Sequence, residues 1–186
     1  TTVETIPASR SYLSADPAAV ARWSGIIGPG DGLKVGIAWQ GSPTHKKDHE
    51  RSFPLRLFGP MAKLPGVRLY SLQKGHGAEQ LDAMADGPKI TDLGCRFDDM
   101  ADAAAAMLNL DLVITPDTAL GHLAAALGIP TWVALPFAPD WRWLLDRDDS
   151  PWYSSIRLFR QAEWNSWPPV FERMAKEIQQ RLDRRA

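Results

Sequence analysis

The chain has 186 residues, 45% of them hydrophobic, and a formal net charge of −1. This size and composition predict one compact domain with a sizeable core. The isoelectric point near 6.4 argues against a nucleic-acid partner, so any anion site must be local. A single cysteine, Cys95, cannot form an internal disulfide, and no apolar run reaches the length of about 18 residues that suggests a transmembrane segment. We therefore expect a cytoplasmic protein.

Residues 1–32 read as a connector from a missing amino-terminal half. Within them a short helix is expected over 16–24, because Asp16 is a good N-cap and Pro17 suits the first helical position. The glycine-rich GPGDG then closes the segment. The expected domain is 33–186.

From residue 33 onward, short apolar runs alternate with helical periodicity. Strands are predicted at 33–39, 67–73, 89–93, 111–115, 131–135 and 154–159. Helices are predicted at 54–64, 78–85, 98–108, 117–127 and 167–185. This alternation predicts an α/β fold, a doubly wound parallel sheet of about six strands with helices on both faces.

In such sheets the ligand lies beyond the carboxyl ends of the strands, where the strand order reverses, commonly between the first and fourth strands. The loop after the first strand, GSPTHKKDHERS (41–52), is long, polar and locally cationic. The fourth strand is followed by Pro116, Asp117 and Thr118. We expect these two loops to meet and to form a small positive pocket.

The segment DTALGHLAAALGIP (117–130) predicts a buried helix whose first turn alone is polar. The first turn of a helix has unpaired N–H groups and the positive end of the macrodipole, and it receives anions. Asp117 is expected to cap this helix, and Thr118 and His122 to share one face near its start. The small Ala119 lets a ligand approach the backbone.

A helix terminus contributes about 0.3–1 kcal/mol toward an anion, whereas micromolar binding requires about 8 kcal/mol. Charge-assisted hydrogen bonds of about 1.5–3 kcal/mol each must be added. Lys46, Lys47 and Arg51 are the expected suppliers, and they would stabilise a leaving group. No GxGxxG follows the first strand and no GxxxxGK[ST] is present, which leaves a nucleotide sugar as the expected phosphate ligand.

Other interpretations of these residues stay open. The HKKDHE run also fits a solvated loop, and His122 also fits a histidine packed in a helix interface. The eight Trp residues are interpreted as packing, with Trp39 at the end of the first strand as a candidate exception. The pair His45 and His49 is a weak metal motif, and no metal site is expected.

Four segments carry a family resemblance: VGIAWQGSPTHKKDHERSFPL, LYSLQKG, DTALGHLAAALGIPTWVALP and PFAPDWRWLLDRDDSPWY. They resemble the carboxyl-terminal, donor-binding half of GT-B glycosyltransferases. Specifically, they resemble bacterial tetratricopeptide-repeat proteins whose transferase region is similar to ADP-heptose lipopolysaccharide heptosyltransferases and, more distantly, to O-linked N-acetylglucosamine transferase. The resemblance covers about residues 33–160.

The resemblance implies a nucleoside diphosphate sugar as donor substrate, with no cofactor and no metal. Carried over to this chain, the implied donor-binding residues are Gly41, Ser42, Gln73, Lys74, Asp117, Thr118, Ala119 and His122. An acceptor hydroxyl would attack the anomeric carbon of the donor, and the nucleoside diphosphate would leave. The general base would lie in the missing half, so the chain is not expected to be active alone.

Two other functions remain open. The chain could be a noncatalytic interaction module that retains the fold, beside helical repeats. It could also be a sugar-phosphate enzyme of the epimerase kind, which would require a tightly held nicotinamide.

Overall fold

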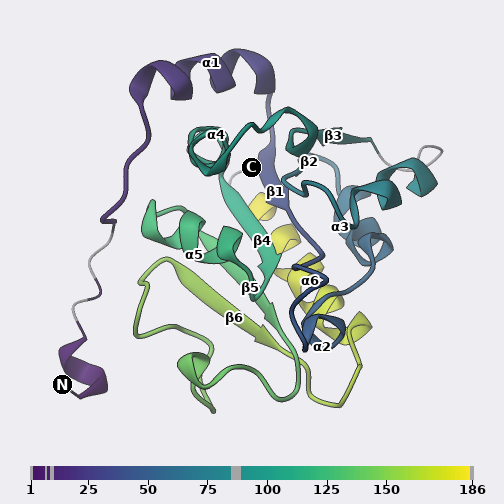
Figure 1. The fold of residues 1–186 in the computed structure, drawn as a ribbon. Coiled ribbons are helices and arrows are strands. Elements are labelled where there is room, and N and C mark those ends of the chain that lie inside the picture. Colours follow the sequence, from purple (N-terminus) through teal and green to yellow (C-terminus); the bar gives the residue numbers. More distant parts are fainter. Residues whose placement is uncertain (1, 7, 9–10, 85–88, 185–186) are drawn as a thin grey trace.

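A computed structural model describes residues 2–6, 8, 11–84 and 89–184. Its centre is one six-stranded sheet in the order β3-β2-β1-β4-β5-β6, in which all neighbouring strands are parallel (Figure 1). The strands are β1 (Leu33–Ile37), β2 (Val67–Ser71), β3 (Ile90–Asp92), β4 (Leu112–Pro116), β5 (Thr131–Leu135) and β6 (Ile156–Arg160). The predicted doubly wound α/β fold is confirmed, and the strand order reverses between β1 and β4.

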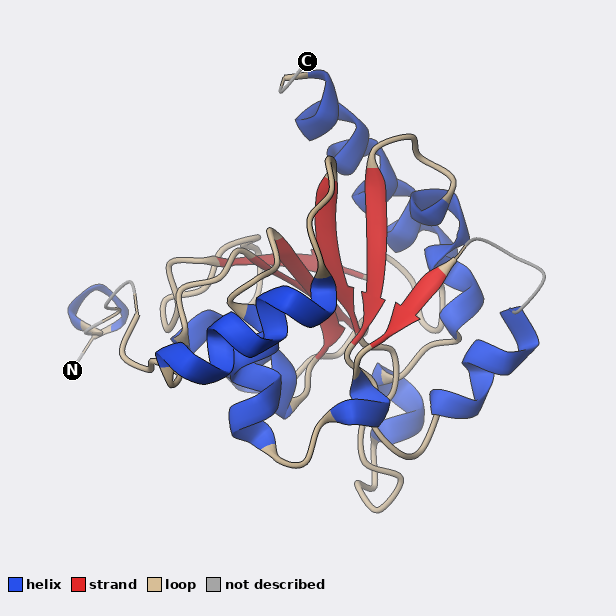
Figure 2. Cartoon of the chain, turned by 90° about the horizontal axis from the view of Figure 1, so that it is seen from above, coloured by secondary structure: helices blue, strands red, loops and turns tan. Residues whose placement is uncertain are grey.

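Helices cover both faces of the sheet (Figure 2). They are α1 (Pro17–Ile27), α2 (Asp48–Arg51), α3 (Gly59–Ala62), α4 (Met100–Met107), α5 (Ala119–Ala126) and α6 (Pro168–Asp183). Side chains of α3 and α6 pack on one face, and those of α1, α4 and α5 pack on the other. The apolar side chains on both faces explain why the strands read as nearly continuous hydrophobic runs.

Two predicted helices differ in the structure. The segment expected at 54–64 is a 3₁₀ turn, Leu55–Phe58, followed by the short α3, because Pro60 lacks the N–H that a continuous helix needs. The helix expected at 78–85 is a 3₁₀ helix over Ala78–Met84. Residues 85 and 185, the expected ends of two helices, lie outside the described residues.

Helix α1 is packed onto the domain. The Asp16 side chain accepts hydrogen bonds from the first-turn amides, as predicted, and Trp23 and Ile27 are buried against α4. Part of the predicted connector therefore contributes to the core. That residues 1–32 also lead to an amino-terminal half stays a prediction.

One close approach of the backbone shapes the edge of the sheet where the strands end. The 3₁₀ turn Gly94–Arg96, which follows β3, lies against the chain at Gln73. A Cβ atom at Gly94 would overlap the Gln73 carbonyl oxygen, so only glycine fits here. Among the described helices, none is both long and apolar enough to cross a membrane.

Candidate functional site

A cavity of about 650 Å³ lies at the carboxyl ends of β1 and β4, where the strand order reverses. We call it the switch-point cavity. Its polar end is formed by Gln40, Gly41, Ser42, Arg51, Thr118 and Ala119. Its apolar end is formed by Leu72, Phe97, Met100, Ala103 and Leu120. The loop 41–52 and the start of α5 therefore meet, as the sequence predicted.

The amino-terminal end of α5 borders this cavity. Thr118, not Asp117, is the N-cap residue, and its side chain makes no capping hydrogen bond. Its Oγ1 atom is instead hydrogen-bonded to Oγ1 of Thr115 at 3.0 Å. Because Thr118, Ala119 and Leu120 line the cavity, the first-turn amides are available to a ligand there. The expectation that Asp117 caps the helix is wrong, because its carboxylate is turned toward His122.

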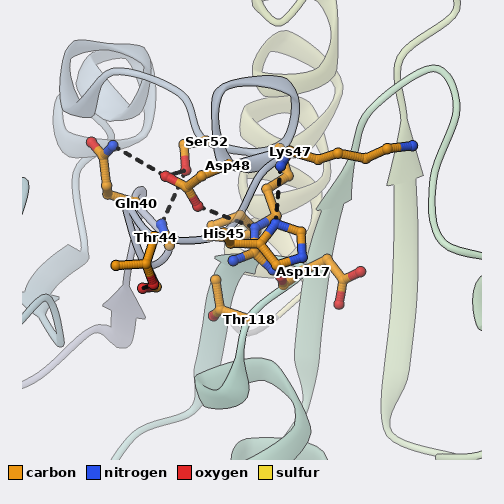
Figure 3. A network of polar contacts seen from close by, with 12 residues as sticks. Gln40, Thr44, His45, Lys47, Asp48, Ser52, Asp117 and Thr118 are labelled. Atoms are coloured by element: carbon orange, nitrogen blue, oxygen red, sulfur yellow. Dashed lines mark hydrogen bonds and ion pairs between the residues drawn. The ribbon is translucent and has the colours of Figure 1, made fainter.

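Arg51 joins the two loops. Its Nη1 donates a hydrogen bond to the Asp117 carbonyl oxygen at 2.6 Å, and its Nε donates to Asp48 Oδ1 at 3.2 Å. The buried Asp48 carboxylate also accepts hydrogen bonds from Ser52 Oγ and Gln40 Nε2 (Figure 3). Sequence reasoning missed Asp48, although an acid three residues before an arginine on a short helix is a recognisable pairing signal.

The other predicted cations are placed differently. Lys47 extends away from Thr118 (Figure 3) and lines a smaller neighbouring cavity of about 150 Å³, together with Asp117 and Arg142. We call this the small cavity; Arg51 borders it as well. Lys46 is exposed and lies outside the linings of both cavities.

The switch-point cavity is not uniformly positive, contrary to expectation. Arg51 and Lys74 line it, but the carboxylate-bearing Asp98 and Asp99 line it as well. The Lys74 ammonium donates hydrogen bonds to the carbonyl oxygens of Phe97 and Asp98. The cationic character is therefore confined to Arg51 and Lys74, and acids lie toward the start of α4.

Gln73 shapes the cavity through its side-chain amide. Its Oε1 accepts hydrogen bonds from the backbone amides of Trp39 and Gln40, at 3.2 and 3.1 Å. Its Nε2 donates to the carbonyl oxygens of Gln40 and His76, at 3.2 and 2.9 Å. Trp39 is fully buried and its indole donates to the Gly77 carbonyl, so it is a packing residue and its proposed exception, as a platform for a sugar ring, is wrong.

His122 faces away from the switch-point cavity. Its ring stacks on Trp143 with centroids 5.4 Å apart, its Nδ1 lies 3.1 Å from the Tyr153 hydroxyl, and its Nε2 lies 3.2 Å from Arg142 Nη1. The distance from His122 Nε2 to Asp117 Oδ1 is 3.7 Å. Thr118 and His122 thus point into different cavities, although both belong to the same end of α5.

This packing perturbs two ionisable groups. Burial acts to raise the pKa of Asp117, but His122, Trp143 and Arg142 outweigh it, so that pKa lies below its usual value. Burial, with the neighbouring Tyr12 hydroxyl, raises the pKa of Tyr153 to about 12. Asp117 is therefore ionised and Tyr153 protonated at neutral pH. Across residues 2–6, 8, 11–84 and 89–184, no group of three His, Cys, Asp or Glu side chains could hold a metal ion.

The strand order, the helices on both faces and the ligand-sized cavity at the switch point define a Rossmann-like α/β domain. Residues 62–136 match the family model described as Glycosyltransferase family 9 (heptosyltransferase).

Over 185 residues the chain is 32% identical to Protein FlbA of Caulobacter vibrioides, a match that covers 95% of this chain and 30% of FlbA. The structure is similar to that of Escherichia coli ADP-heptose lps heptosyltransferase II, with a TM-score of 0.66 and 14% identity over 91% of this chain and 54% of that one. It is also similar to E. coli heptosyltransferase WaaC with ADP-2-deoxy-2-fluoro heptose, with a TM-score of 0.54 and 17% identity over 96% of this chain and 51% of that one. At these identities the two structures show that the fold is shared.

Proposed function

We propose that the chain is the donor-binding half of a GT-B glycosyltransferase that uses a nucleoside diphosphate sugar. The observation that carries the proposal is the meeting of loop 41–52 with the uncapped start of α5 over the β1/β4 switch point. The partial match to the family 9 glycosyltransferases and the shared fold of the heptosyltransferases support it.

The two ends of the switch-point cavity suit the two ends of a nucleotide. Apolar side chains such as Phe97, Met100 and Leu120 would enclose the base. Asp98 would accept hydrogen bonds from ribose hydroxyls. The first-turn amides of α5, with Arg51, would receive the diphosphate.

No single one of these contacts supplies the free energy of a micromolar site, but together they approach it. The start of α5 supplies about 0.3–1 kcal/mol by its dipole, and each charge-assisted hydrogen bond adds about 1.5–3 kcal/mol. Two or three such bonds from Arg51 and the backbone amides, with burial of the base at about 25 cal/mol per Å², approach the roughly 8 kcal/mol of a micromolar site.

In the proposed reaction an acceptor hydroxyl attacks the anomeric carbon, and the bond to the diphosphate oxygen breaks. Negative charge then collects on the leaving nucleoside diphosphate. Arg51 and the α5 amides would stabilise that charge, with Lys47 at the margin of the small cavity. No group in this mechanism requires a metal ion or another cofactor, and the general base would come from an amino-terminal half.

The wider assignment is part of the same proposal. The chain spans 30% of FlbA and about half of each heptosyltransferase chain, so the second half of the active site would lie in another part of the protein. We propose a bacterial, cytoplasmic protein in which tetratricopeptide repeats accompany the transferase, with a distant similarity to O-linked N-acetylglucosamine transferase.

Calorimetric titration with ADP, UDP and GDP tests the proposal. We expect saturable binding of at least one of them and a clear preference among the three. If none binds at millimolar concentration, the proposal is wrong, and a noncatalytic module that retains the fold becomes the better account.

A further inference from the structure

An aromatic pocket of about 410 Å³ lies on the far side of His122 from the switch-point cavity. Trp141, Arg142, Trp152 and Tyr153 line it together with His122. Apart from His122, these residues come from the loop between β5 and β6. The family resemblance implies His122 as donor-binding, but the other residues of this pocket have no part in the proposed donor site.

The two tryptophans are unusually exposed for their size. Trp141 is 74% exposed and Trp152 is 37% exposed, and their rings meet edge to face at 84° with centroids 6.3 Å apart. Tryptophan is highly buried on average, so an exposed pair that lines a pocket is typical of a binding surface. The sequence-based interpretation as packing is therefore wrong for Trp141, whereas it holds for the buried Trp143.

The surrounding loop holds these rings in place. Trp152 Nε1 donates to the Arg142 carbonyl oxygen at 2.8 Å, and Arg142 Nε donates to Asp140 Oδ1 at 2.9 Å. Asp140 also caps the 3₁₀ turn that carries Trp141. Leu144, the residue directly after this turn, has φ 55° and ψ −170°, a conformation that a non-glycine residue rarely adopts. The contacts of the surrounding loop must hold Leu144 in this conformation.

The floor of the pocket is polar and its charge is balanced. Tyr153 and His122 contact each other through hydroxyl and ring nitrogen, and the second ring nitrogen of His122 lies 3.2 Å from Arg142 Nη1. The Tyr153 hydroxyl and the Arg142 guanidinium are therefore the groups of the floor that can form hydrogen bonds with ligand hydroxyl groups. Arg142 is paired with Asp140. The described lining thus offers no surplus cation for a phosphate, and it favours a neutral ligand that has both an apolar face and hydroxyl groups. A saccharide ring has this combination.

The pocket neighbours the proposed reaction site through shared lining residues. Arg142 borders both the aromatic pocket and the small cavity, and Arg51 borders both the small cavity and the switch-point cavity. A donor whose diphosphate lies at Arg51 would place its sugar toward the small cavity. A group in the aromatic pocket would then approach that sugar from the side opposite the nucleotide.

We propose that the aromatic pocket binds a saccharide ring of the acceptor, stacked on Trp141 and hydrogen-bonded to Arg142 and Tyr153 on the pocket floor. This inference rests on the proposed function, because it assigns the acceptor side of the same reaction. It names glycan as the acceptor class and places part of acceptor recognition in this half of the enzyme.

Nuclear magnetic resonance of the indole N–H groups provides the test. The probes are the methyl glycosides of glucose, mannose and N-acetylglucosamine, with cyclohexanol as an apolar control. We expect at least one glycoside to cause a saturable shift of the Trp152 indole signal. Trp141→Ala should weaken that binding by about tenfold, the factor expected for the loss of one good aromatic contact.

Trp164→Ala is the matched control, because Trp164 is 60% exposed and lies outside the pocket lining. It should leave glycoside binding unchanged. The inference is overturned if no glycoside causes a saturable shift, if cyclohexanol binds equally well, or if both variants behave alike. The ADP affinity of Trp141→Ala should equal that of the wild type. If the chain binds nucleotide but no glycoside, this inference is wrong and the proposed function is unaffected.

Discussion

Arg51 illustrates how a single side chain builds the cavity from two loops. Its side chain is only 18% exposed, and its guanidinium connects the buried Asp48 to the carbonyl of Asp117. A partly buried ion pair stabilises the fold little unless its other polar atoms also have hydrogen-bond partners. Here Ser52 and Gln40 donate hydrogen bonds to the Asp48 carboxylate. The result is a fixed cation at the cavity wall.

Thr118→Ala should lower the affinity for a nucleoside diphosphate by about tenfold, which corresponds to one hydrogen bond to a charged group. The side chain does not cap α5, so the melting temperature should change little. Calorimetry and thermal unfolding measure the two effects. Thr91→Ala, at an exposed position in β3, is the control, and equal affinities in the two variants would remove Thr118 from the site.

Asp102 predicts a pH dependence of stability. Hydrogen bonds from the Asp98 amide and the Trp23 indole, with the Arg22 charge, hold the pKa of this carboxyl below its usual value despite burial. A lowered folded-state pKa stabilises the fold above the unfolded pKa of about 3.9, and that contribution is lost as the pH falls through the folded pKa. Urea unfolding should show that the free energy of unfolding declines over this acidic range in the wild type. The decline should be smaller in Asp102→Asn. An identical decline in both proteins would contradict this account.

At the residue scale, the sequence predicted which loops meet but not where each side chain points. Ser42, Arg51 and Thr118 line one cavity as expected, because topology alone brings their loops together. The direction of His122 depends on its stacking with Trp143, twenty-one positions later, and no local pattern encodes that contact.

At the scale of elements, α1 is the helix whose role was least expected. It lies against α4, and Trp23 packs edge to face on Phe97 at 5.2 Å while its indole donates to Asp102. Residues before β1 therefore complete one face of the core.

Trp23→Ala should lower the free energy of unfolding by about 3–5 kcal/mol, because it leaves a cavity between α1 and α4. Trp164→Ala, at an exposed position, should change it by no more than about 0.5 kcal/mol. Denaturant unfolding of both variants measures the difference. Similar small losses in the two would show that α1 is not part of the cooperative domain.

The strands were predicted well because a buried parallel sheet demands apolar runs of limited length, and those runs are bounded here by glycine, proline and polar residues. The segment 54–64 was predicted poorly. Its apolar spacing is helical, but the Gly59 and Pro60 pair divides it into two short turns.

At the scale of the whole molecule, the fold places a nucleotide-sized cavity, a small cavity and an aromatic pocket next to one another, with a lining residue shared between each neighbouring pair. Arg51 lines both the switch-point cavity and the small cavity, and Arg142 lines both the small cavity and the aromatic pocket. This order matches nucleotide, transferred sugar and acceptor in the proposed reaction.

The 186-residue chain should bind a nucleotide sugar but should not transfer the sugar, because the general base would lie in another part of the protein. Release of nucleoside diphosphate, measured with this chain and with the full-length protein, tests that expectation. Turnover by the chain alone at the rate of the full-length protein would contradict it.

The central claim is that a diphosphate binds between Arg51 and the start of α5. A crystal structure of the chain with the tightest-binding nucleoside diphosphate tests it most directly. We predict phosphate oxygens within hydrogen-bonding distance of Arg51 and of the Ala119 and Leu120 amides, with the base near Phe97. A nucleotide bound elsewhere, such as the basic cleft between α6 and the loop at residues 147–148, would contradict the claim.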